Sequence, residues 1–261
     1  MMLSMLEFAR EIARGAGEIL REGYYKDFRV DAKKNRELVT EYDFRCEEYL
    51  RQAIGERYPD HSILAEEEGG SISETGFTWV IDPLDGTNNF AHRYPMFAVS
   101  IGVLDKGKPV LGVVYEPLRD ELFSSDGGVS FLNGKPIHVE TRDRIDDSIF
   151  STGFPYDIKN KEKNNLANFT KFCTKGRGIR RGGSAAIDLS YVAAGRLDGH
   201  WENTLKAWDI AAGYVIVKGA GGICTDYSGK DWVPGQDQVV AANPVLHEKM
   251  LSLINDHSEE E

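Results

Sequence analysis

The chain has 261 residues, of which 42 are acidic and 31 are basic, so its formal net charge at pH 7 is −11. This acidic balance argues against a general binder of nucleic acids or anionic membranes, because both surfaces repel net negative charge. Hydrophobic residues make up 41% of the chain and charged residues 28%, which excludes intrinsic disorder and collagen-like structure. A chain of this length forms one or two domains and needs no disulfide or metal merely to fold.

The cysteines form no C-x-x-C pair, so we expect neither a zinc site nor a disulfide framework. They are Cys46, Cys173 and Cys224. Charged residues interrupt the first twenty positions, which argues against a secretory signal peptide. No apolar run reaches about 18 residues, so we expect no membrane span. A reduced cytoplasmic location is therefore the expectation.

Apolar residues repeat at helical spacing over residues 3–25 and predict an amphipathic helix. A second helix is predicted over residues 40–58. Its inward-facing side chains are expected to be those of Phe44, Tyr49, Leu50 and Ile54. Strands are predicted over residues 78–81, 98–104, 109–115 and 121–124, with a hairpin turn at Asn133-Gly134. The first half is thus a helix pair followed by a mostly antiparallel sheet.

From about Arg144 strands and helices alternate, which predicts an α/β second half. The predicted strands cover residues 148–153, 198–201, 222–225 and 239–242. The predicted helices cover residues 164–173, 184–194, 208–218 and 243–254, and the acidic tail over residues 256–261 is expected to fray. We divide the chain into an N-terminal α+β subdomain, residues 1–144, and a C-terminal α/β subdomain, residues 145–261. No low-complexity linker separates them, so an extensive interface is expected.

The most informative segment is Trp79-Val80-Ile81-Asp82-Pro83-Leu84-Asp85-Gly86-Thr87. An apolar strand leads directly into two aspartates three positions apart. Pro83 fixes φ and Gly86 permits unusual backbone geometry, so the turn can aim both carboxylates and the Leu84 carbonyl at one point. An oxygen-only ligand set suits a hard cation such as Mg²⁺. The competing interpretation is an ordinary surface turn, in which Asp, Pro and Gly are common.

Two further acidic features are ambiguous by themselves. Glu66-Glu67-Glu68 follows an apolar stretch and, in isolation, is more typical of a solvated charge run. Asp209 lies beside Trp208 at the start of an apolar helix, where a helix N-cap is the more usual role.

Taken together, these features resemble the inositol monophosphatase family. The resemblance rests on Glu66-Glu67, on the motif over residues 82–87, and on Trp208-Asp209-Ile210-Ala211-Ala212-Gly213 with Gly221-Gly222. It covers nearly the whole chain, because residues 38–43 and 183–186 also match. It implies the layered α/β/α/β/α sandwich of the sugar phosphatases and metal-dependent hydrolysis of a small phosphate monoester.

The resemblance also implies two to three Mg²⁺ ions per site. The implied ligands are Glu66, Asp82, Asp85, Asp209 and the carbonyl of Leu84. The implied catalytic residues are Thr87, Asp43 and Glu67, of which Thr87 and Asp43 orient and help to deprotonate the attacking water. Metal ions neutralise the phosphate dianion and lower the pKa of a bound water, so positioning and electrostatics dominate. Without the resemblance, Thr87 fits a turn residue and Asp43 a solvated helix carboxylate.

The implied substrate contacts come from both halves of the chain. The amides of Gly86 and Thr87 would meet phosphate oxygens, and Glu202 would meet substrate hydroxyls. Either Arg180 or Arg181 would meet a substrate phosphate, with plain surface charge as the equal alternative. The full predicted set is Asp85, Gly86, Thr87, Arg180, Gly183, Ser184, Ala185, Glu202 and Asp209. Lys206 departs from a histidine found in some relatives.

Inositol monophosphate is the expected substrate, fructose 1,6-bisphosphate the second choice, and a nucleotide 3′-phosphate the third. The third ranks last because Asn88 follows the motif threonine, where such phosphatases often carry lysine. A homodimer and Li⁺ inhibition, tuned by the loop over residues 33–37, are expected from the resemblance alone.

Other phosphatase and hydrolase motifs do not fit. The spacing from Asp82 to Thr87 is one residue longer than D-x-D-x-T/V, Arg177 lies at the wrong offset from Cys173, and no G-x-S-x-G occurs. Four of the six histidines lack paired metal-ligand spacing and are expected to be exposed or fully hydrogen-bonded. These four are His61, His92, His138 and His200.

A non-enzymatic alternative remains, because some members of the family resemble partners of RNA polymerase. A basic surface for such a role would use Lys171, Lys175, Arg177, Arg180 and Arg181.

Overall fold

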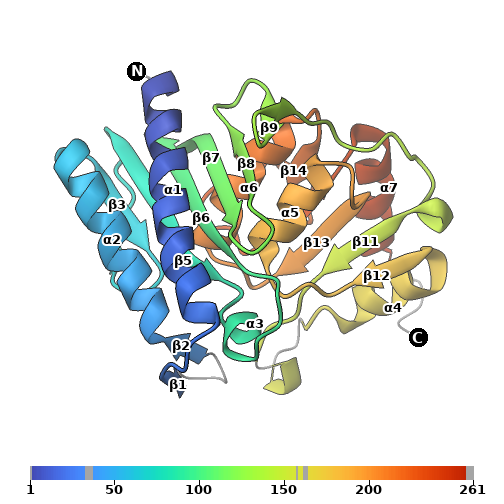
Figure 1. Cartoon of the computed structure of the whole chain (residues 1–261). Helices are drawn as coiled ribbons and strands as arrows, with labels where there is room; N and C mark the ends of the chain where they lie inside the picture. Colours follow the sequence, from blue (N-terminus) through green and yellow to red (C-terminus); the bar gives the residue numbers. More distant parts are fainter. Residues whose placement is uncertain (1, 33–37, 157, 161–163, 257–261) are drawn as a thin grey trace.

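The computed structural model describes residues 2–32, 38–156, 158–160 and 164–256. Helices and sheets alternate in five layers, with one helix pair on the left of Figure 1, one pair between two sheets, and one pair on the right. In layer order the helices are α1 (Met2–Tyr24) and α2 (Glu41–Arg57), then α5 (Ala185–Ala193) and α6 (Ala207–Gly219), then α4 (Leu166–Lys175) and α7 (Pro244–Ile254). The predicted α/β/α/β/α sandwich is confirmed.

The larger sheet has eight strands, and only its β3–β5 pair is parallel. Its strands are β3 (Ser62–Ala65), β4 (Gly69–Gly70), β5 (Phe77–Asp85), β6 (Ala98–Asp105), β7 (Lys108–Glu116), β8 (Glu121–Ser125), β9 (Ser130–Leu132) and β10 (Lys135–Pro136). They lie in the order β10-β9-β8-β7-β6-β5-β3-β4.

The smaller sheet has five strands in the order β12-β11-β13-β15-β14, and β11 pairs in parallel with both of its neighbours. The strands are β11 (Ile149–Thr152), β12 (Gly178–Arg180), β13 (Gly199–Asn203), β14 (Ile223–Thr225) and β15 (Gln238–Ala242). Shorter elements complete the fold: the β1 (Val30–Ala32) and β2 (Leu38–Thr40) ribbon, α3 (Thr87–Ala91), and the 3₁₀ turns η2 (Ile145–Asp147) and η3 (Ile158–Asn160).

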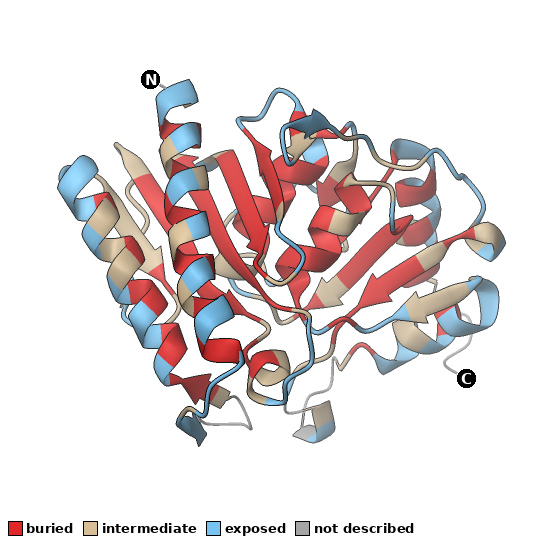
Figure 2. Ribbon diagram, in the orientation of Figure 1, coloured by how far each residue is buried: buried red, intermediate tan, exposed pale blue. Residues whose placement is uncertain are grey.

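Strand side chains alternate between layers and so join the layers to one another. On β5, Trp79 and Ile81 pack with α1 and α2, whereas Val80 packs with α5 and α6. Figure 2 shows the buried residues concentrated on the sheets and on the two middle helices. The middle core contains residues from both predicted subdomains, among them Phe123 and Val239, so the two halves share one continuous apolar interface. The subdomain boundary after residue 144 stays a prediction.

The predicted helices and strands are confirmed with shifts of a few residues at their ends, and Asn133-Gly134 forms the tight turn between β9 and β10 with both φ angles positive. The expectation for Phe44 is wrong, because 50% of its surface is exposed. The inward face of α2 follows a four-residue spacing through Tyr42, Cys46, Leu50 and Ile54, which leaves Phe44 on another face. Residues 33–37 and 257–261 lie outside the described residues. The second range contains most of the predicted acidic tail. No described helix is long and apolar enough to cross a membrane.

Helix α6 approaches the larger sheet closely because the sheet presents glycines to it. A Cβ on Gly112 would lie 2.2 Å from the carbonyl oxygen of Ala212, and one on Gly102 would lie 2.8 Å from the Cβ of Ala211. At the start of the helix, the Ser100 hydroxyl donates to the Trp208 carbonyl at 3.2 Å. This packing fixes the N-terminus of α6 beside the end of β5.

Replacing Gly112 with Ala is expected to destabilise the protein by about 1–3 kcal/mol, because the helix backbone must shift to admit a methyl group. The measurement is the free energy of unfolding from urea denaturation. Gly55→Ala on α2 is the matched control, since no atom lies within 4 Å of its added Cβ. The control should be unchanged or up to about 1 kcal/mol more stable. Equal stability of Gly112→Ala and the wild type would contradict the close-approach argument.

Candidate active site

One cavity of about 560 Å³ brings together most of the residues predicted from the motifs. It lies where the end of β5, the β3–β4 turn, the N-termini of α5 and α6, and the end of β13 meet. Its lining includes Glu66, Glu67, Asp82, Leu84, Asp85, Gly86, Thr87, Gly183, Ser184, Ala185, Glu202 and Asp209. Phe154, Tyr156, Arg181 and Lys206 also line it.

A bulge in β5 brings Asp82 and Asp85 to the same cavity. Asp82 pairs with Ser100 and Asp85 with Ala98, so three steps on β5 match two steps on β6. In a regular strand, residues three positions apart point to opposite faces, and the extra residue restores Asp85 to the face of Asp82. The motif is therefore a distorted strand end, and the surface-turn interpretation is wrong. The amide of Leu84 donates to Asp82 Oδ1 at 3.0 Å and fixes that side chain.

Asp85 joins the two halves of the molecule. Its Oδ2 accepts hydrogen bonds from the Ser184 hydroxyl at 2.6 Å and from the Ala186 amide at 2.8 Å. Ser184 is the N-cap of α5, so the carboxylate lies at the positive end of that helix. Burial nevertheless raises the pKa of Asp85, and these hydrogen bonds only partly offset the shift.

Asp209 is the third residue of α6, and Lys206 is the N-cap. The N-cap interpretation of Asp209 is therefore wrong. Its Oδ2 accepts a hydrogen bond from the Lys206 amide at 2.6 Å, while the carboxylate lines the cavity.

Glu47 supports the turn that carries Glu66 and Glu67. It is 1% exposed, and its carboxylate accepts from the amides of Glu67 and Glu68, both at 2.9 Å. Arg51 donates to Glu47 at 2.9 Å and to the carbonyl of Gly69 at 2.7 Å, so the turn is fixed at both ends. Sequence reasoning missed Glu47, although its four-residue spacing from Asp43 placed both on one helix face.

Thr87 and Asp43 form a buried pair beneath the cavity. The Thr87 hydroxyl lies 2.9 Å from Asp43 Oδ1 and 3.0 Å from the Leu84 carbonyl oxygen, and it donates to one of them at a time. Asp43 Oδ2 accepts from both the amide and the hydroxyl of Thr40 at 2.7 Å, completing the capping box of α2. Burial raises the pKa of Asp43 to about 6, so the expectation of a solvated carboxylate is wrong.

The cavity concentrates negative charge. Burial and the neighbouring carboxylates Glu66, Asp85 and Asp209 raise the pKa of Asp82 well above its ordinary value. The pKa of Asp209 is also raised well above its ordinary value, mainly because the carboxylate is buried and secondly because of the charge of Asp85. Among the described residues, no three His, Cys, Asp or Glu side chains close on one point tightly enough to form a preassembled metal cluster. The donor set itself, carboxylates and one carbonyl, fits a hard divalent cation that would relieve this repulsion.

The two predicted arginines separate. Arg181 lines the cavity, and the cavity lining does not include Arg180, whose side chain donates to the Ile179 carbonyl at 3.2 Å. The basic cluster is also divided, because Lys171 is only 5% exposed and donates to the carbonyl of Ile254. The five cations therefore do not form one shared surface.

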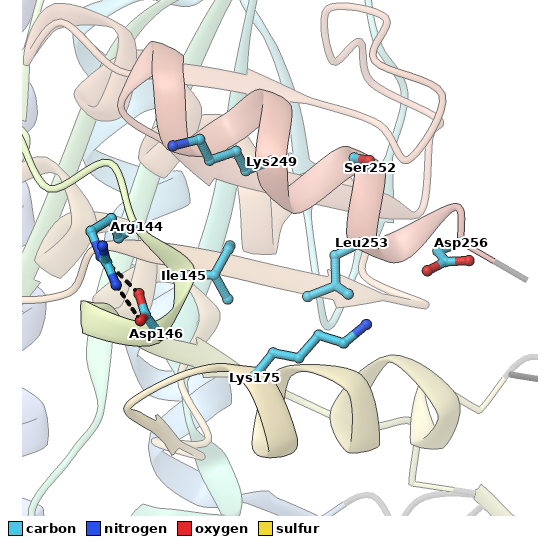
Figure 3. A pocket seen from close by; sticks show the side chains of 8 residues that line it. All are labelled: Arg144, Ile145, Asp146, Lys175, Lys249, Ser252, Leu253 and Asp256. Carbon is cyan, nitrogen blue, oxygen red and sulfur yellow. Dashed lines mark hydrogen bonds and ion pairs between the residues drawn. The ribbon is translucent and has the colours of Figure 1, made fainter. Parts of the chain in front are cut away.

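A second cavity of about 410 Å³ lies between η2, α4 and α7 (Figure 3). Arg144 donates to Asp146 at 3.0 Å within it. It is lined by Arg144, Ile145, Asp146, Lys175, Lys249, Ser252, Leu253 and Asp256. The motif carboxylates do not line it, so the first cavity is the candidate active site.

Comparison with known proteins agrees with the geometry. The sequence profile described as "Inositol monophosphatase family" matches residues 1–259. The chain belongs to this family. It is 43% identical to an inositol-1-monophosphatase of Synechocystis sp. over 249 residues, covering 94% of this chain and 86% of the relative. It is 40% identical to the Nus factor SuhB of Escherichia coli (strain K12) over 259 residues, covering 98% and 97%.

A solved inositol monophosphatase from Anabaena (Nostoc) sp. PCC 7120 superposes with a TM-score of 0.89 at 37% identity, covering 97% of this chain and 95% of that one. Members of the inositol monophosphatase family are generally metal-dependent. Membership supports metal-dependent hydrolysis of a phosphate monoester as the class of reaction.

In metal-free protein, Asp82→Asn is expected to raise the melting temperature at pH 8 by about 2–4 °C, corresponding to about 1 kcal/mol. The folded-state pKa of Asp82 is raised, so the stability that its neutral form contributes is present below the ordinary value of 3.8 and is lost as pH rises. The gain from Asn should therefore shrink as pH falls from about 8 toward 4. Thermal denaturation in EDTA over this range measures it.

Asp198→Asn is the control for that experiment. Asp198 is also buried, but its carboxylate accepts from Arg142 at 2.9 Å and from the Ile149 amide at 2.7 Å, so its replacement should lower the melting temperature in the same buffers. A lower melting temperature for Asp82→Asn at pH 8 would show that Asp82 supports the fold rather than opposing it.

Proposed function

We propose that the protein hydrolyses a phosphate monoester with Mg²⁺, and that myo-inositol monophosphate is its preferred substrate. The observation that carries the proposal is the single cavity in which four carboxylates and the Leu84 carbonyl face the buried Thr87–Asp43 pair. Such a site strongly attracts hard cations and, through them, the phosphate group that they bind.

Mg²⁺ would be held by oxygen ligands, as two to three ions per site. The proposed ligands are Glu66, Asp82, Asp85, Asp209 and the Leu84 carbonyl, all of which line the cavity. When bound, the ions supply neutralisation of the phosphate dianion and acidification of a water molecule. The hydrogen bonds to Asp82, Asp85 and Asp209 described above hold each carboxylate in place for this role.

The protein's own contribution to the reaction is to position and deprotonate the water. The Thr87 hydroxyl accepts from the attacking water while it donates to Asp43, whose pKa of about 6 leaves it mostly ionised at neutral pH. Glu67, which lines the cavity on the turn supported by Glu47, is proposed to assist. The amides of Gly86 and Thr87 would donate to phosphate oxygens.

The substrate alcohol would occupy the side of the cavity formed by the second half of the chain. Glu202 would accept from its hydroxyls, and Gly183, Ser184 and Ala185 would form the adjacent wall. When it is ionised, Glu202 would repel a second phosphate, which favours a monophosphate. Arg181 partly offsets this charge, so fructose 1,6-bisphosphate is the alternative substrate.

Activity is expected to require added Mg²⁺ and to vanish in EDTA. Asp82→Asn and Asp209→Asn should each lower kcat/KM by about 10²–10³-fold, because the amide keeps the shape but loses the charge that holds the ion. Phosphate release from inositol monophosphate is the measurement, and Asp146→Asn in the second cavity is the control. Full turnover after exhaustive metal removal would contradict the proposal.

Glu202→Gln is expected to lower kcat/KM for inositol monophosphate by about 10-fold, because a neutral amide is a weaker acceptor for hydroxyls. Arg181→Ala should selectively impair hydrolysis of fructose 1,6-bisphosphate. Arg180→Ala is the matched control and should change kcat/KM for neither substrate, since Arg180 lies outside the cavity lining. An unchanged value for inositol monophosphate in Glu202→Gln would refute the proposed contact.

A transcription-associated role is the second candidate, on the single ground that relatives at 40% identity are named Nus factor SuhB. Burial of Lys171 removes one of the five cations from the basic surface that the sequence suggested for it. Binding of the protein to RNA polymerase, together with no hydrolysis in Mg²⁺, would favour this role over the enzyme. A homodimer, a cytoplasmic location and Li⁺ inhibition stay predictions.

A further inference from the structure

His200 is a buried histidine that the proposed reaction does not use. It lies on β13, two residues before Glu202, so both side chains point to the same face of the strand. The His200 side chain is fully buried, and its Nε2 has no hydrogen-bond partner among the described residues. The expectation that His200 is exposed or fully hydrogen-bonded is therefore wrong. A buried ring nitrogen without a hydrogen-bond partner lowers the stability of the folded state, so the acidic side chain nearest to it is a candidate partner.

The acidic side chain nearest to Nε2 is Glu202, the carboxylate proposed to face the substrate. His200 Nε2 lies 3.6 Å from Glu202 Oε2, just beyond hydrogen-bond distance. On the other side of the ring, Nδ1 lies 2.9 Å from the hydroxyl of Ser151, its register partner on β11. Asp188 Oδ2 lies 3.9 Å from Nδ1, too far to accept a hydrogen bond.

Both tautomers of the ring fit the contact with Ser151. With the proton on Nε2, the Ser151 hydroxyl donates to Nδ1 and the ring presents an N–H donor to Glu202. With the proton on Nδ1, the ring donates to Ser151 and turns a lone pair of Nε2 toward Glu202, which with an ionised carboxylate is an arrangement of two acceptors. Burial lowers the pKa of His200 to about 3, so the ring is neutral at physiological pH.

Glu202 is confined on its other side as well. A Cβ on Gly153 would lie 1.9 Å from Glu202 Oε1, so the carboxylate fits only because that residue is glycine. Burial, then Asp188 and Asp209, favours the protonated form of Glu202 and raises its pKa. A protonated carboxyl would be a poor acceptor for substrate hydroxyls. A neutral N–H donor on its inner side would oppose this protonation and orient the oxygens.

We propose that His200 is a positioning residue whose Nε2–H donates to Glu202 when a substrate hydroxyl occupies the cavity, so that the enzyme prefers polyol phosphates to phosphates without hydroxyls. The inference rests on the proposed function and deepens it by naming what fixes the alcohol specificity. The contact requires only a few tenths of an ångström of closure from the 3.6 Å separation.

Two variants separate the two ring nitrogens. His200→Gln keeps an N–H donor near the position of Nε2, whereas His200→Asn keeps a polar group only near Nδ1. For myo-inositol 1-phosphate, His200→Asn should raise KM and lower kcat/KM by about 10–100-fold, and His200→Gln should stay within about threefold of the wild type. For p-nitrophenyl phosphate, whose alcohol has no further hydroxyl, both variants should stay within about twofold.

His247→Asn is the matched control, because His247 is also buried, is bonded through Nε2 to Thr225 at 2.8 Å, and lies outside the cavity lining. It should leave kcat/KM for both substrates unchanged. An equal loss on both substrates in His200→Asn would assign His200 a merely structural role and overturn the inference. Activity of the wild type on neither substrate would instead overturn the proposed function, and the inference with it.

A measurement on the wild type reports the tautomer independently of the kinetics of the variants. In protein with ¹⁵N-labelled histidine, the ring shifts of His200, assigned by their absence in His200→Gln, should report the neutral Nε2–H tautomer at pH 7. An Nδ1–H tautomer or a charged ring would overturn the inference. Should His200→Asn fail to fold, Ser151→Ala takes its place: loss of the hydroxyl donor should shift the tautomer toward Nδ1–H and reproduce the loss on myo-inositol 1-phosphate alone. Equal kinetics of Ser151→Ala and the wild type would then count against the inference.

Discussion

The close approach of α6 to the larger sheet is the constraint on which both the fold and the candidate site depend. This helix is apolar on nearly every face, as expected for one buried between two sheets. Gly102 and Gly112 let its backbone lie against β6 and β7 with no side chain between them. Asp209 is carried on the first turn of the helix, so the depth at which α6 packs also determines where this carboxylate lies relative to β5.

Burial of like charge is the second theme of the molecule. Asp82, Asp85 and Asp209 come from two elements far apart in the sequence, and their pKa values are all raised. Folding alone gains nothing from this arrangement, because each carboxylate loses water and meets a neighbour of the same sign. The large middle core must offset the cost, and a site that opposes the fold in this way is typical of groups kept for function.

Hydrophobic periodicity predicted most helices and strands, and the resemblance to the inositol monophosphatase family implied the layered fold and the residues of the cavity. That resemblance rested on the motif over residues 82–87 together with Glu66-Glu67 and residues 208–213. The Arg180 contact and the inward Phe44 were not confirmed, since which side of a strand or helix faces the core depends on packing partners outside the local pattern.

Residues that act through another residue were the hardest to predict. Glu47 and His200 belong to no motif, and their importance appears only when the β3–β4 turn and the Glu202 carboxylate are placed beside them. The bulge in β5 was also not predicted from the sequence, although it brings Asp82 and Asp85 to one face. The functional roles of the cavity residues stay proposals.

Helix α2 ties two parts of the cavity to one rigid body. Asp43 and Glu47 lie one turn apart on the same face, and the first is bonded to Thr87 while the second holds the amides of Glu67 and Glu68. Any sliding of α2 along its axis would therefore displace the hydroxyl of Thr87 and the acidic turn together and in the same direction. The two walls are mechanically linked, so a distant force applied to this helix, by a mutation in its outer face or by a bound partner, would move them as a unit rather than one against the other.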